Sequence, residues 1–257
     1  MLAGMVKRTD RPLPDTPETV KTSRRRVSTP SEYVRQYIDR FRFTEGRLAE
    51  SSSHGRVPKM GDAEILRDLL TLLEGADDRD ASANCAKLRA FVVAYGVSRT
   101  FAGLSKKPLC LQPVVAHLLA RKGALQGGNL VHEVEELADA CVQAGFHRNL
   151  SFASKCLCML GHLVPIFSSE AVAYLRSKGA LRHCKAGDGY EEFYYAWWVE
   201  YEKERMLYEA SAAHHLAHGE GMAEEHEVLE CRLGIEWFAM RGYDVKLMAQ
   251  GAPLRSK

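Results

Sequence analysis

The chain has 257 residues, of which 46% are hydrophobic, and it carries 35 Lys and Arg against 33 Asp and Glu. This hydrophobic content is enough to bury a sizeable core, which excludes disorder of the whole chain. No run of eighteen apolar residues occurs, and residues 1–6 are too short for the apolar part of a signal peptide, so we expect a soluble, cytoplasmic protein without a membrane span.

The charges are unevenly distributed along the chain. Residues 99–185 hold 11 basic and 5 acidic side chains, whereas residues 188–230 hold 2 basic and 12 acidic ones. A phosphate backbone would be attracted to the first of these regions and repelled by the second. Solvated helix faces are the alternative interpretation of the same pattern.

Cysteine and histidine patterns indicate neither disulfides nor a metal site. The seven cysteines are scattered and form no C-x-x-C pair, so we expect reduced and mostly buried thiols. His214 and His218 are four residues apart and could share a helix face, but no H-E-x-x-H pattern is present. The sequence therefore predicts no metal and no cofactor.

The first segment, residues 1–28, is predicted to be a flexible basic arm. It contains three closely spaced prolines and a run of three arginines, and it has no apolar periodicity. A helix start follows directly at Thr29, Pro30 and Glu32, which supply an N-cap hydroxyl, a proline in the first turn and a glutamate three residues after the cap. Residues 29–257 are predicted to form one helical domain.

Further helices are predicted wherever apolar residues recur every three or four positions and a glycine follows. Asp62 and Asn129 are expected to cap two of them. The expected helices include residues 62–75, 82–95, 113–122, 129–145 and 223–241. Because β-branched residues nowhere alternate with polar ones for more than about four positions, the pattern favours an all-α fold.

An aromatic stripe runs along one predicted helix in the acidic part of the chain. Its members recur at intervals of three and four residues and therefore share a helix face: Tyr190, Phe193, Tyr194, Trp197 and Tyr201. Such a stripe could stack extruded bases, but core packing is the favoured interpretation because its surroundings are acidic.

The stretch from residue 149 to 175 combines a lysine in an apolar setting with two turn signals. Its first part, S-F-A-S-K at residues 151–155, is predicted to be a turn that leads into an apolar helix. A glycine and a proline are expected to end that helix. Ser168 or Ser169 can then cap the next one, because a hydroxyl can accept a hydrogen bond from a first-turn amide.

These residues resemble the hairpin of the helix-hairpin-helix DNA glycosylases. They are most similar to a bacterial, 8-oxoguanine-glycosylase-like branch that reads S-F-A-S-K and then F-P-I-Y-D-S. The matching residues are F-A-S-K at 152–155 and P-I-F-S-S at 165–169. The resemblance implies a two-lobed helical domain of the glycosylase type, with its hairpin region at residues 145–175, that acts on double-stranded DNA as a monomer.

The resemblance also implies a catalytic group. Lys155 lies where the family carries a lysine nucleophile, and burial among apolar neighbours would lower its pKa and free the amine. Ser168 stands where the family's pattern has the catalytic aspartate, and Glu170 is a nearby carboxylate that could substitute for it. The expected DNA-binding residues are Arg148, Asn149, Ser151, Ala153, Ser154, Lys106 and Lys107.

The sequence thus predicts a DNA glycosylase that excises a damaged or modified base, in genome maintenance or in defence against phage DNA. Two alternatives remain open at this point. The first is a catalytically inactive DNA-binding protein on the same fold. The second is a helical protein-interaction module without DNA activity.

Overall fold

The computed structural model describes residues 28–42, 61–74, 81–95, 101, 111–121, 128–182, 189–218 and 224–254. These residues form helices joined by turns and one extended connector, without a strand among them, which confirms the all-α class. Apart from Ser28, the predicted arm lies outside the described residues. The helices are α1 (Pro30–Phe41), α2 (Asp62–Glu74), α3 (Ala81–Ala94), α4 (Gln112–Ala120), α5 (Leu130–Gln143), α6 (Leu150–Met159), α7 (Ser169–Ser177), α8 (Tyr190–Glu202), α9 (Arg205–Ala217) and α10 (Glu224–Gly251), followed by the 3-10 turn η5 (Ala252–Leu254).

The predicted helix starts are confirmed where a side chain can satisfy a first-turn amide. The Thr29 hydroxyl accepts from the Glu32 amide at 3.2 Å, and the Glu32 carboxylate accepts from the Thr29 amide at 3.0 Å, which completes the capping box of α1. Asn129 caps α5 in the same way, through the Val131 amide at 3.1 Å. These caps fix where each helix begins along the chain.

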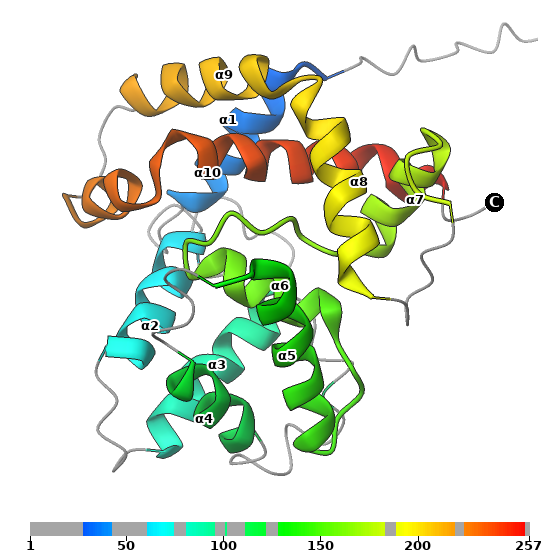
Figure 1. The fold of residues 1–257 in the computed structure, drawn as a ribbon. Helices are drawn as coiled ribbons and strands as arrows, with labels where there is room; N and C mark the ends of the chain where they lie inside the picture. Colours follow the sequence, from blue (N-terminus) through cyan, green and yellow to red (C-terminus); the bar gives the residue numbers. More distant parts are fainter. Residues whose placement is uncertain are drawn as a thin grey trace, which may run out of the picture.

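The helices form two groups (Figure 1). One group contains α1, α7, α8, α9 and α10, in which α10 packs against α1, α7 and α9. The other contains α2 to α6, in which α5 packs on α6 and on α4. Contacts of α1 with α2 and of α5 with α8 join the groups, and one continuous apolar core runs through both.

The aromatic stripe of α8 belongs to the core, as the favoured interpretation predicted. Tyr190, Phe193, Trp197 and Tyr201 are fully buried. Trp197 meets Tyr243 of α10 edge to face, with ring centroids 5.1 Å apart. The stripe therefore anchors α8 to α10, and these buried rings are not available for stacking on bases.

The last helix is longer than the sequence predicted. The expected end near residue 241 is wrong, because α10 continues to Gly251 and is only kinked at Gly234, where φ is +76°. Gly242 lies inside this helix, and glycine is needed there because α1 crosses it closely. A Cβ at that position would lie 2.5 Å from Cγ2 of Val34, so only glycine allows this approach.

Candidate active site

The predicted turn at residues 151–155 is helical in the structure. The turn comes earlier, at Gly145, where φ is +85°, and α6 begins at Leu150. Asn149 is the reason for this early start, since its side chain accepts from the amide of Phe152 at 2.9 Å. Lys155 consequently lies in the middle of α6 instead of at its first turn.

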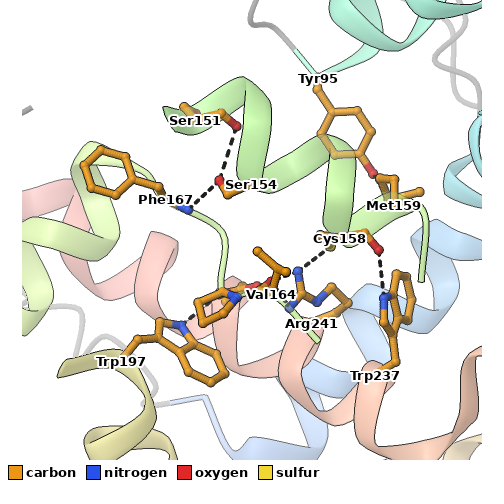
Figure 2. A network of polar contacts seen from close by, with 12 residues as sticks. Tyr95, Ser151, Ser154, Cys158, Met159, Val164, Phe167, Trp197, Trp237 and Arg241 are labelled. Carbon is orange, nitrogen blue, oxygen red and sulfur yellow. Dashed lines mark hydrogen bonds and ion pairs between the residues drawn. The ribbon is translucent and has the colours of Figure 1, made fainter. Parts of the chain in front are cut away.

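One hydrogen bond brings two of the predicted catalytic positions together. The buried hydroxyl of Ser154 donates to the Leu150 carbonyl at 2.8 Å. It accepts from the Phe167 amide at 3.0 Å (Figure 2). Ser154 precedes Lys155, and Phe167 precedes Ser168. The bond therefore places the middle of α6 beside the residue that starts α7.

Ser168 and Glu170 lie at the start of α7. The Ser168 hydroxyl accepts from the Ala171 amide at 3.1 Å, which confirms Ser168 as the cap. Glu170 lies in the first turn, where a carboxylate is favoured by the helix dipole. Gly251 of α10 packs directly on this turn, because a Cβ there would come within 1.9 Å of the Glu170 carbonyl oxygen.

Lys155 is partly buried, and this burial is the main influence on the pKa of its amine. Burial lowers the pKa of Lys155 below the ordinary lysine value, which Glu170 opposes and Arg40 reinforces. The ammonium makes no hydrogen bond or ion pair with any residue that the structure describes. The structure thus brings the middle of α6, with Lys155, beside the start of α7, with Ser168 and Glu170, and no residue in the described part of the chain bonds the amine.

The segment between α6 and α7, residues 162–168, is an extended connector that runs along the seam between the two helix groups (Figure 1). Its backbone is held from several sides. Arg241 of α10 donates to the Val164 carbonyl at 2.8 Å (Figure 2). The Tyr190 hydroxyl of α8 donates to the Pro165 carbonyl. An extended segment between helices needs such partners because it cannot satisfy its own backbone groups.

Arg241 and Asp244 form the buried ionic centre of this network. Arg241 lies 3.0 Å from Oδ2 of Asp244, while the Trp197 indole donates to Oδ1 of Asp244 at 3.0 Å. The Oδ2 contact is ionic only, because its geometry does not meet that of a hydrogen bond. Burial raises the pKa of Asp244 to about 6, against the lowering effect of Arg241.

The α6 side of the network is completed by backbone and sulfur contacts. The Trp237 indole donates to the Cys158 carbonyl at 2.9 Å, and Arg241 donates to the Cys158 sulfur (Figure 2). Burial raises the pKa of the Cys158 thiol to about 12, so it stays a thiol. These contacts fix the end of α6 to α10.

The residues predicted to bind DNA are placed less favourably. Arg148 forms ion pairs with Glu135 and with Asp139 of α5, the second at 2.7 Å, so a phosphate would have to compete with two carboxylates. Asn149, Ala153 and Ser154 are buried in structural positions, and Ser151 is partly buried. Lys106 and Lys107 lie outside the described residues.

In comparisons with known proteins, no family model, no curated protein and no solved structure matches the chain. Within the described part of the chain, no helix is both long enough and apolar enough to cross a bilayer.

Sequence reasoning missed the charged residues that surround this site from other helices. Arg241 and Asp244, three residues apart in an apolar helix, were the available signal for a buried ion pair. Arg40 and Asp62 gave no such signal, because they lie 22 residues apart and meet only through the packing of α1 on α2. Asp62 was expected to cap α2, but it is the first helical residue and its carboxylate binds Arg40.

Proposed function

We propose that the protein is a DNA glycosylase of the helix-hairpin-helix type, in which the amine of Lys155 attacks the sugar of an extruded nucleotide. The observation that carries this proposal is the state of Lys155. It is a partly buried lysine with a lowered pKa, without an internal partner among the described residues, and with a carboxylate nearby. These are the properties of a lysine nucleophile.

In the proposed reaction, the bond between C1′ and the base is replaced by a bond between C1′ and the nitrogen of Lys155. The neutral amine attacks C1′, and the glycosidic bond breaks with its electron pair moving to the base. The nitrogen of Lys155 loses one proton after attack, and we assign Glu170, the carboxylate that acts on Lys155 electrostatically, to pass this proton to the leaving base. The C1′–O4′ bond then breaks, O4′ takes a proton from water, and the nitrogen lone pair forms an iminium between Lys155 and C1′.

The role of Ser168 follows from the same geometry. A hydroxyl in that place cannot stabilise a cationic sugar as a carboxylate would, and it is engaged with the Ala171 amide. We therefore expect slow excision of ordinary damaged bases and faster reaction when the base is a good leaving group. Genome maintenance and defence against modified phage DNA are the settings that fit such an activity.

The test is reductive trapping on a duplex that contains one abasic site. Borohydride should trap a covalent adduct with the wild-type protein, and peptide mapping should find it on Lys155. Lys155→Ala should abolish the adduct, whereas Lys178→Ala, which removes an exposed lysine near the end of α7, should leave it unchanged. Absence of the wild-type adduct, or its survival in Lys155→Ala, would overturn the assignment of Lys155.

A second arm uses Ser168→Asp, which keeps an N-cap acceptor and adds the carboxylate of the family pattern. We expect it to speed release of a modified base, since a negative charge stabilises the developing cationic sugar. Unchanged release would mean that Glu170 already performs this role.

A catalytically inactive DNA-binding protein is the second candidate. It is favoured by the use of the Ser168 hydroxyl as a cap, which retains the structural role of that position without its chemistry. The outcome that identifies it is duplex binding at low salt without any adduct on the abasic duplex. An interaction module would give neither, and its surface would be the exposed apolar side chains Tyr195, Val199, Met206 and Leu207.

A further inference from the structure

Arg40 lies near the end of α1. Among the described residues, its guanidinium group has one partner at Nε and one aromatic ring against its plane. Its Nε donates to Oδ1 of Asp62 at 3.1 Å, and its Cζ lies 5.2 Å from the centroid of the Tyr95 ring. The Asp62 side chain is 1% exposed, whereas that of Arg40 is 50% exposed. The two terminal nitrogens of Arg40 make no hydrogen bond with the described residues.

The contacts of Tyr95 connect this arginine with α6. The Tyr95 hydroxyl meets the sulfur of Met159 at 2.7 Å (Figure 2). Met159 lies four residues after Lys155, which is about one turn, so the two side chains share a face of α6. Arg40 therefore stacks over a ring whose hydroxyl contacts α6 about one turn from Lys155. In agreement with this placement, Arg40 is among the causes of the lowered pKa of Lys155.

The carboxylates near Arg40 and Lys155 each interact with one of the cations of the protein. Asp62 is behind Arg40, where burial raises its pKa and Arg40 lowers it. Asp244 is in the ion pair with Arg241, and Glu170 acts on Lys155 from α7. Arg40 and Lys155 carry like charges that interact, and an anion between them would remove their repulsion.

We propose that Arg40 is a phosphate-binding residue, whose two terminal nitrogens hold one phosphodiester group of the substrate strand beside the amine of Lys155. The planar guanidinium offers paired N–H donors that match two phosphate oxygens, and Asp62 and Tyr95 fix its orientation before the ligand arrives. The source of the phosphate, a DNA strand, rests on the proposed function, but the recognition chemistry does not.

Such a contact would explain how the chain can place a sugar at Lys155 although Arg148 is engaged elsewhere. Each sugar in a strand is joined to its own phosphates, so a phosphate fixed at Arg40 restricts the position of C1′. Arg40 would then contribute to affinity and to positioning, and not to the bond-breaking step itself.

The experiment compares duplexes that differ by one charge. Each carries a stable abasic analogue, with the phosphate on its 5′ or 3′ side either natural or replaced by a neutral methylphosphonate. For the wild type, one replacement should weaken binding about tenfold. In Arg40→Gln the natural and neutral duplexes should bind equally. Arg35→Gln makes the same charge change on an exposed residue of α1 and should keep the wild-type preference.

Loss of Arg40 leaves the Asp62 carboxylate buried without its ion-pair partner, which lowers the stability of the folded protein. The double variant Arg40→Gln with Asp62→Asn removes both charges and gives the same prediction for binding. If either folded variant retains the full preference for the natural phosphate, the assignment of Arg40 is overturned.

A separate arm does not require DNA. Inorganic phosphate should protect Lys155 from acylation by an amine-specific reagent in the wild type, and the protection should disappear in Arg40→Gln. If the abasic duplex yields no adduct but both Arg40 effects are present, the phosphate site stands and Lys155 is not a nucleophile. If DNA is not bound but phosphate still protects Lys155 through Arg40, the phosphate group comes from a smaller ligand. Equal acylation with and without phosphate, together with no methylphosphonate effect, would refute the site.

Discussion

The connector, residues 162–168, and the surroundings of Arg40 and Lys155 differ in how far their polar groups are hydrogen-bonded. In the connector, Ser154, Arg241 and Tyr190 are bonded to its backbone, and Arg241 is fully buried. Around Lys155 and Arg40, by contrast, N–H donors remain without partners among the described residues. The connector network therefore holds α6 and α7 in position, whereas the donors of Lys155 and Arg40 are available to bind a ligand.

Removing Arg241 should cause the largest loss of stability, because it removes one partner of the buried ion pair that holds the connector. Arg241→Met leaves the Asp244 carboxylate buried and the Val164 carbonyl without its donor. We expect a loss of about 3–5 kcal/mol in the free energy of unfolding, measured by urea titration with circular dichroism. Arg35→Met, at an exposed position of α1, is the control and should change stability by about 0.5 kcal/mol or less.

A matched double variant sharpens this prediction. Arg241→Met with Asp244→Asn removes both charges, so part of the lost stability should return. Equal stability of the single variant and the wild type would mean that the network does not hold the connector.

Removing the Ser154 hydroxyl should have a smaller effect, confined to the link between α6 and the connector. Ser154→Ala leaves the buried Phe167 amide without its acceptor, which costs about 1–3 kcal/mol. Ser211→Ala removes an exposed hydroxyl that bonds the Leu207 carbonyl, and it should stay within about 0.5 kcal/mol of the wild type. Urea titration of both variants gives the comparison, and equal losses would contradict the special role of Ser154.

The pH dependence of trapping is the most sensitive probe of the Lys155 side. Only the neutral amine attacks, so the trapping rate should rise with pH through the native pKa of Lys155 and level off below the ordinary lysine value, because burial lowers that pKa. Arg40→Gln should move the midpoint to higher pH, since Arg40 lowers the pKa. Glu170→Gln should move it to lower pH, since Glu170 raises it. Shifts in the opposite directions would contradict this electrostatic arrangement.

The sequence predicted most of the fold because the signals for helices are local. Thr29, Asn129 and Ser168 each cap the helix that follows, and their residue types and spacings are enough to recognise this. The same rules failed at Gly242, which reads as a helix end but lies inside α10, where glycine is required because Val34 approaches it from a distant helix. Local rules carry no information about such tertiary contacts.

The candidate site was predicted only in part for the same reason. Lys155, Ser168 and Glu170 lie within sixteen residues of sequence, and the structure brings them together through Ser154 and Phe167. Arg40 comes from the other helix group and could be connected with Lys155 only after α1, α3 and α6 were placed. The buried roles of Ala153 and Ser154 likewise depend on the early start of α6 at Leu150.

The packing of α1 against α9 and α10 also bears on how the chain is made. Residues of α1 leave the ribosome before the other described helices, but their main neighbours, α9 and α10, are synthesised more than 160 residues later. The helices α2 to α6 contact chiefly one another and are complete much earlier. Helices α2 to α6 can therefore fold during translation. The apolar face of α1, by contrast, stays without its main packing partners until α9 and α10 have been synthesised.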